Sequence, residues 1–179
     1  FDPSRHAVAT SNRVDGSQSR TSIVTDGSRM SRTFIGFDFG TKRIGVATGQ
    51  DVTGTAQAIG TVSNSGKEGP WTEIKALIDE WRPDGLVVGI PFTSIDSETE
   101  LARAARNFAA KLNTRYNLPV DFIDETLTSI AAEQIISSAT VPGKRFIKKR
   151  ETLRDQIAAE LILQTYLNHQ LNCADANRD

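Results

Sequence analysis

The fold is decided by one stretch near the start of the ordered pattern, which reads Phe34-Ile35-Gly36-Phe37-Asp38-Phe39-Gly40-Thr41-Lys42-Arg43-Ile44-Gly45-Val46-Ala47. Aromatic and β-branched residues dominate it and predict two strands, with the polar segment 40–43 as their hairpin connection. Side chains alternate along a strand, so Asp38 and its neighbouring glycines share a face. One face of the first strand then carries Ile35, Phe37 and Phe39, and the other carries Gly36, Asp38 and Gly40.

Asp38 is the charged residue of an otherwise apolar strand. An ionised carboxylate on a covered sheet is unfavourable unless a cation, hydrogen-bond donors or water compensate it. The glycines beside it let a bulky ligand come close. Metal or phosphate chemistry at Asp38 is one interpretation. A solvated acid at a strand end, or one that caps a turn, is the other.

Composition bounds the class of protein. The chain has 179 residues, 38% hydrophobic and 24% charged, which is ordinary for one globular domain. Its formal net charge of -1 means that a nucleic-acid partner would have to bind local basic patches. Cys173 is the single cysteine, which excludes an intrachain disulfide framework and favours a reducing, cytoplasmic setting. No apolar run is long enough to span a bilayer, so no membrane partner is expected.

The first 32 residues differ from the rest. They are rich in Ser, Thr, Arg, Asp and Gly and have no apolar periodicity, so residues 1–32 are expected to be a flexible extension or leader. A targeting peptide is the rival interpretation, and the acidic residues argue against it. We expect one domain over residues 33–171 and a flexible tail over residues 172–179.

After the opening hairpin the pattern alternates between strand and helix. The expected elements are a third strand over residues 57–62, a helix over 71–81, a strand over 86–90, a helix that buries Leu101, Ala104, Ala105, Phe108 and Leu112, a strand over 120–124, a helix that starts at Thr128 or Ser129, a basic loop over 140–150 and a last helix over 151–168. The order βββαβαβαα predicts an α/β fold whose five-stranded mixed sheet has helices on both faces.

Acidic residues stand at the ends of several of these elements. They are Asp38 on the first strand, Asp124 and Glu125 at the end of the fifth, and Asp155 in the first turn of the last helix. Carboxylates that converge from separate elements form a hard oxygen site suited to Mg²⁺ or Mn²⁺. Asp155 could instead be an acid favoured by the helix dipole, and the Asp124-Glu125 pair a solvated turn.

Basic residues cluster before the last helix. They are Lys144, Arg145, Lys148, Lys149, Arg150 and Arg154, with Lys42 and Arg43 in the hairpin. A polyanionic substrate would need such cations beside an acidic site, because the acids alone would repel it. A solvated charged face is the alternative interpretation.

Several of these segments together resemble the YqgF family, also called RuvX or Holliday-junction-resolvase-like. The resemblance covers about residues 33–171, on the motifs Phe34–Ala47, Val87–Pro91, Asp124–Thr128, Asp155–Ala159 and Ile162–Gln164. It implies an RNase H-like fold, an Mg²⁺- or Mn²⁺-dependent nuclease, and a role in trimming the 5′ end of precursor 16S ribosomal RNA. By motif, Asp38, Glu125 or Asp124, and Asp155 would be the catalytic acids.

This chain departs from the family pattern at two positions. Thr126 stands where the family commonly has Arg, so a contact made there could be missing or supplied by Lys42 or Arg43. Arg154 stands where an apolar residue is usual, and it could add affinity for the substrate.

The expected activity is therefore that of a hydrolase, a nuclease acting on structured RNA or branched DNA, as a monomer or homodimer. The alternatives are a Holliday-junction resolvase and a non-catalytic RNA-binding assembly factor. The Asp-x-Gly-Thr turn at Asp38–Thr41 also occurs in phosphotransferases of the actin and sugar-kinase type. Those proteins need two domains of this fold to bind a nucleotide, and we expect one such domain in this chain.

Overall fold

The computed structural model describes residues 30–66, 69–91, 99–124 and 144–176. Within them the elements are β1 (Thr33–Phe39), β2 (Arg43–Gln50), β3 (Thr55–Ser63), α1 (Trp71–Trp81), β4 (Gly85–Ile90), α2 (Glu100–Tyr116), β5 (Val120–Asp124) and α4 (Lys144–Ala176). All five expected strands are confirmed, as is the helix over residues 71–81. The expected helix that starts at Thr128 or Ser129 lies outside the described residues.

The strands form one mixed sheet in the order β3-β2-β1-β4-β5. The hairpin strands β1 and β2 are antiparallel, as are β2 and β3, whereas β4 pairs parallel to β1 and β5 parallel to β4. A bulge between Val46 and Ala47 leaves Ile59 without a partner residue in the register of β2 and β3. This topology places β1, and with it Asp38, at the centre of the sheet.

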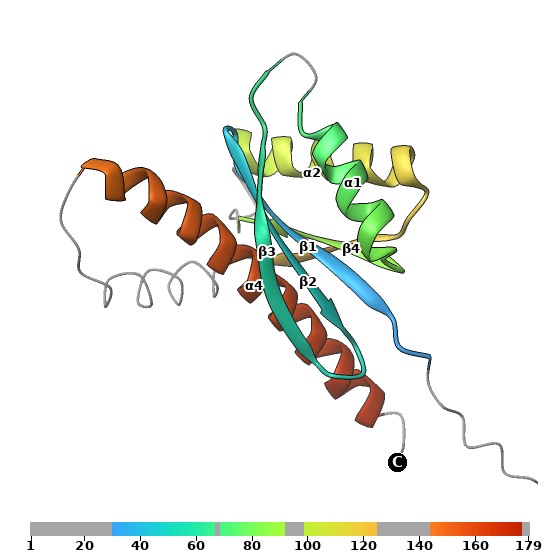
Figure 1. Cartoon of the computed structure of the whole chain (residues 1–179). Helices are drawn as coiled ribbons and strands as arrows, with labels where there is room; N and C mark the ends of the chain where they lie inside the picture. The colour runs from blue at the N-terminus through green and yellow to red at the C-terminus, as the bar shows by residue number, and fades with distance from the viewer. Residues whose placement is uncertain (1–29, 67–68, 92–98, 125–143, 177–179) are drawn as a thin grey trace, which may run out of the picture.

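Helices cover both faces of the sheet (Figure 1). On one face α1 and α2 pack on a core that includes Ile35, Phe37 and Val88. On the other face the long helix α4 packs on Phe34 and Val87. The alternation predicted for β1 is therefore confirmed, and Asp38 belongs to the face that α4 covers.

The ends of α1 and α2 follow from local residues. Arg82 ends α1 in the left-handed conformation, with its N–H bonded to the Ile78 carbonyl at 2.9 Å, and Pro83 cannot continue the helix. Thr99 caps α2 by accepting a bond from the Ala102 N–H at 3.2 Å. The expectation that Leu101 is buried is wrong, since it is 37% exposed. The stripe that meets the sheet starts one residue later, at Ala102.

Helix α4 is longer than expected at both ends. It starts at Lys144, so the expectation of a basic loop up to Arg150 is wrong for residues 144–150. Lys and Arg are good helix formers, and their charge alone does not predict a loop. The helix also continues to Ala176, beyond the boundary expected at Leu171, so residues 172–176 are helical. None of the helices in the described ranges is both long enough and apolar enough to cross a membrane.

Candidate active site

Asp38 lies near the end of the central strand, and it is partly buried. Its register partners are Gly45 in β2 and Gly89 in β4, so the neighbouring positions on both sides carry no side chain. Because Gly45 and Gly89 have no side chain, other backbone segments can approach the sheet closely on both sides of Asp38. This arrangement across the strands comes from the register and could not be read from the sequence of β1 alone.

Helix α4 meets the sheet at Gly45, next to Asp38. A Cβ atom added to Gly45 would lie 1.9 Å from the Asp155 carbonyl oxygen and 3.3 Å from the Ala159 Cβ. The backbone of α4 at Asp155 therefore rests directly on the residue that pairs with Asp38. The structure brings these two predicted acids to one face of the sheet, one strand apart.

The side chain of Asp155 is held by Arg43. The Arg43 Nε donates to Asp155 Oδ2 at 2.8 Å, and its Nη2 donates to Glu151 Oε2 at 3.1 Å. The hydrogen bond to Asp155 raises the pKa of the Arg43 guanidinium above its ordinary value, so the group stays charged. One cation thus offsets part of the negative charge of two carboxylates on α4.

Arg43 was predicted to contact nucleic acid, and in this structure it contacts carboxylates. Arg43 and Gly45 are two residues apart on β2 and so lie on one face, where α4 covers them. That alternation was available from the sequence. The position of Glu151 one helical turn before Asp155 was a second signal, since both side chains can then reach the same cation.

Asp124 lies on the opposite face of the sheet from Asp38. Its register partner in β4 is Ile90, which packs against Ala102 and Ala105 of α2. Ile123 is instead in register with Gly89 and packs on the core under α4. Glu125, the other acid expected at this strand end, lies outside the described residues.

The donor set suits a hard divalent cation, because Asp38 and Asp155 both offer carboxylate oxygens. In the part of the chain that the structure describes, no three His, Cys, Asp or Glu side chains gather closely enough to hold a metal ion. Asp38 and Asp155 are therefore suitable ligands for a divalent cation, and the complete site would need at least one further ligand.

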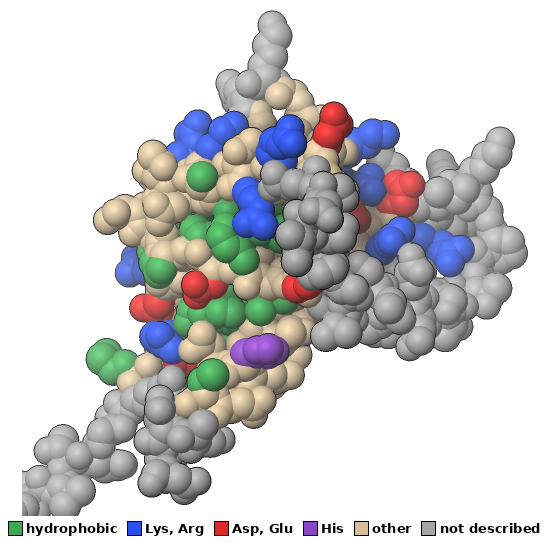
Figure 2. Space-filling view, turned by 180° about the vertical axis from the view of Figure 1, so that it is seen from behind, with side chains coloured by type: hydrophobic (Ala, Val, Ile, Leu, Met, Phe, Trp, Pro, Cys, Tyr) green, Lys and Arg blue, Asp and Glu red, His purple; other side chains and the backbone are tan. Residues whose placement is uncertain are grey.

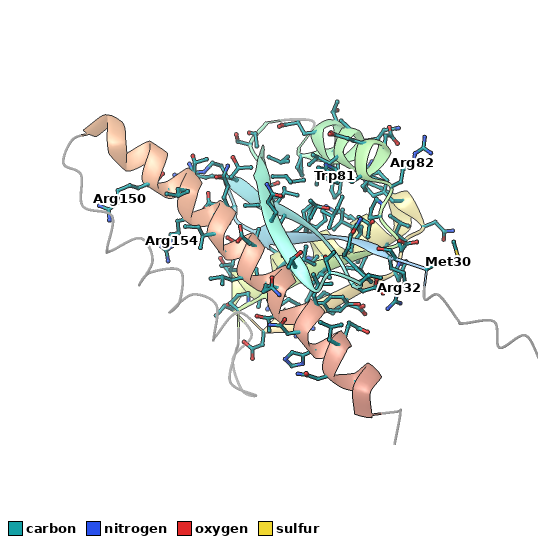
Figure 3. The ribbon with its side chains drawn as sticks, turned by 60° about the horizontal axis from the view of Figure 1, so that its bottom comes forward. Met30, Arg32, Trp81, Arg82, Arg150 and Arg154 are labelled. Atoms are coloured by element: carbon teal, nitrogen blue, oxygen red, sulfur yellow. The ribbon has the colours of Figure 1, made fainter. Side chains whose placement is uncertain are left out.

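The predicted basic residues divide into two groups. The side chains of Lys42, Arg150 and Arg154 are described and are exposed. Arg150 and Arg154 are four residues apart and project from the same side of α4, near its start (Figure 3). The side chains of Lys144, Arg145, Lys148 and Lys149 lie outside the described part, although their backbone is helical.

Further cations and a cavity lie on the α2 side. Seen from behind, Lys and Arg side chains are frequent along the upper part of the molecule (Figure 2). A cavity of about 390 Å³ there is lined by Phe39, Trp71, Phe108 and Lys111, among others. None of the predicted acids lines this cavity, so we do not assign it as the catalytic site.

The five-stranded mixed sheet, with helices on both faces and Asp38 on its central strand, has the architecture of the RNase H-like fold. Residues 32–169 match the RuvX family, described as Holliday junction resolvase. The chain belongs to this family, and with it to the hydrolases that act on phosphodiester bonds. The RNase H-like fold implied by the resemblance is confirmed.

Relatives with curated names cover most of the chain. A protein of Actinobacillus pleuropneumoniae serotype 5b is 42% identical over 141 residues, which is 79% of this chain and 100% of that protein. One of Coxiella burnetii (strain Dugway) is 45% identical over 138 residues, 77% of this chain and 94% of its own length. Both are named "Putative pre-16S rRNA nuclease". RuvC of Thermus thermophilus, solved with a Holliday junction substrate, is 15% identical with a TM-score of 0.44, and the match covers 79% of this chain and 96% of that one.

Proposed function

We propose that this protein is a nuclease dependent on Mg²⁺ or Mn²⁺ that processes the 5′ end of precursor 16S rRNA in the cytoplasm. The observation that carries the proposal is the contact of the Asp155 backbone with Gly45, the register partner of Asp38. This contact supports a site in which an acid of the last helix acts together with the acid of the central strand. The names of the two curated relatives support the choice of RNA.

The third catalytic acid is Glu125 rather than Asp124. The register of β5 puts Asp124 on the α2 face, away from Asp38. Of the two acids that could complete the site, this leaves Glu125. Asp38, Glu125 and Asp155 would hold the metal, and Asp124 would support it at most from outside the ligand set.

A bound divalent ion would supply an activated water and stabilise the leaving oxygen of the phosphodiester. The residues of this chain would hold and orient the ion. Arg43 restrains the Asp155 carboxylate through Oδ2, and the second carboxylate oxygen can accept further contacts. Packing of α4 on the sheet keeps bulk water from the side of Asp38 that faces the helix.

The exposed cations would bind the phosphate backbone. Lys42 lies in the hairpin that follows Asp38, and Arg150 and Arg154 lie before Asp155 on α4. Cations on both sides of the acids offset the repulsion between carboxylates and a polyanion. Lys144, Arg145, Lys148 and Lys149 would extend this surface toward the start of the helix.

The test is cleavage of a precursor 16S rRNA fragment in the presence of Mn²⁺ by the wild type and by Asp38→Asn. Lewis-acid stabilisation is worth several kcal/mol, so we expect the variant to cleave on the order of 100-fold more slowly or worse. Asp79→Asn, an exposed acid on α1 at the other face, is the matched control and should cleave at the wild-type rate. Unchanged cleavage by Asp38→Asn overturns the proposal.

The second candidate is a Holliday-junction resolvase, which the description of the matching family favours. Branched DNA in the same assay distinguishes it, because a resolvase would cut the junction faster than the RNA. If the wild type binds RNA but cleaves neither substrate with Mn²⁺, the protein is instead a non-catalytic assembly factor.

A further inference from the structure

The edge strand β3 is met by side chains of α4 along part of its length. The Ala56 N–H donates to Gln164 Oε1 and the Ala58 N–H donates to Glu160 Oε2, each at 3.0 Å. These two amides are two residues apart and point away from β2, where an edge strand would offer them to water or to another chain. Helix α4 thus satisfies two outward donors of the sheet.

The spacing of helix and strand makes this contact regular. Glu160 and Gln164 are four residues apart, about 6 Å along a helix, and Ala56 and Ala58 are two apart, about 6.6 Å along a strand. The series continues past Ala56, because Gln164 Nε2 donates to the Gly54 carbonyl at 2.6 Å. We call these side-chain bonds from α4 to residues 54–58 the edge ladder.

The edge ladder differs in kind from the apolar part of the contact between α4 and the sheet. In that part, Ile162, Leu163 and Leu167 of α4 are fully buried against the sheet. Apolar burial is non-directional, so it favours contact but fixes the position along the helix axis only loosely. Hydrogen bonds weaken steeply with distance and angle, and a ladder of them therefore selects one axial position.

That axial position decides where Asp155 lies. Asp155 is five residues before Glu160 on the same rigid helix, and its carbonyl rests on Gly45. We propose that Glu160 and Gln164 are positioning residues, which fix the register of α4 along the sheet and so hold Asp155 beside Asp38. The proposal deepens the proposed function, because it assumes that Asp155 is one of the ligands.

The first measurement needs no metal. The Nε–H of Arg43 donates to Asp155, so its NMR cross-peak reports the position of that carboxylate. The double variant Glu160→Ala with Gln164→Ala should shift this peak and speed its exchange with solvent. Glu160→Gln keeps an acceptor oxygen and should retain the wild-type peak. His169→Ala, exposed on the same helix, is the control.

The second measurement is Mn²⁺ affinity by calorimetry. Loss of groups that orient metal ligands commonly weakens binding 10- to 100-fold, so we expect the double variant to bind about 10-fold more weakly. Glu160→Gln and His169→Ala should stay within about 2-fold of the wild type. Asp38→Asn tests the proposed metal site separately. If this variant binds Mn²⁺ with wild-type affinity, the metal site is refuted, whereas the Arg43 peak still tests the position of Asp155.

The outcomes separate positioning from mere stabilisation. If the double variant keeps the Arg43 peak and the Mn²⁺ affinity, the positioning role is refuted, even if the variant is less stable or associates through β3. If the Arg43 peak moves in the double variant and not in Glu160→Gln, the acceptor oxygens set the register. Hydrogen exchange at the Ala56 and Ala58 amides confirms that the edge ladder itself has been removed.

Discussion

Gly45 offers a test of the site that changes no acid and no cation. In Gly45→Ala the new Cβ would meet the Asp155 carbonyl oxygen at 1.9 Å and the Asp155 carbonyl carbon at 2.6 Å. Both are backbone atoms, so no side chain can rotate away. Ordinary contact begins at 3.4 Å, and the helix must therefore retreat from β2 by about 1.5 Å.

This retreat has two expected consequences. Overpacking costs about 1–3 kcal/mol of the free energy of unfolding, measured by urea denaturation. A functional site tolerates displacements of only about 0.5 Å, so Mn²⁺ affinity should fall about 10-fold or more and cleavage on the order of 100-fold. Both losses would arise although every proposed ligand is intact.

Val46→Ala is the control that separates stability from position. Val46 is fully buried on the other face, in the core under α1 and α2. Its truncation should cost about 2–3 kcal/mol while leaving α4 in place on Gly45. Mn²⁺ affinity should then stay at the wild-type level. The reasoning is refuted if Gly45→Ala binds Mn²⁺ normally, or if Val46→Ala loses affinity to the same extent.

Two further predictions concern the basic helix face and the anchor of α4. Replacing Arg150 and Arg154 with Gln should weaken RNA binding and lower the slope of log K against log salt by about 1.4–1.8, whereas Arg82→Gln, at the opposite end of the molecule (Figure 3), should change neither. Tyr166 donates to Asp121 Oδ2 at 2.6 Å, and Tyr166→Phe should cost about 1 kcal/mol at pH 7. Burial, and then this hydrogen bond, raises the pKa of Tyr166, so its contribution is complete below about pH 10 and is lost as pH rises further. Denaturation of both proteins from pH 7 to 11 should therefore show the difference shrinking; a constant difference would contradict the assignment.

The sequence predicted most of the fold because the strands are marked by strong local signals. β1 alternates, β4 is apolar throughout, and each is bounded by Gly or Pro. The start of α4 was missed because Lys144–Arg150 was interpreted by its charge, while Lys and Arg favour helices. Where a helix extends past the sheet that it covers, it needs no apolar stripe. Apolar periodicity therefore cannot reveal that part of the helix.

The candidate site was predictable only in part. Asp38 and Asp155 could be singled out by their residue type and position in elements. Asp124 and Glu125 could not be told apart, because the choice depends on the register of β5 with β4. The bond between Arg43 and Asp155 joins residues 112 apart. Local patterns show which face of its strand or helix each residue belongs to, but they do not show that these two faces meet.

The glycines around Asp38 show how the register changes an interpretation. Gly36 was expected to leave room for a ligand, but a Cβ there would lie 2.8 Å from the Leu163 Cβ, so α4 fills that space. The space beside Gly45 is likewise occupied by the backbone of α4 at Asp155. The helix thus closes the Asp38 face along the strand. For the site that we propose, this favours approach of the substrate from the carboxyl end of β1, where Lys42 is exposed.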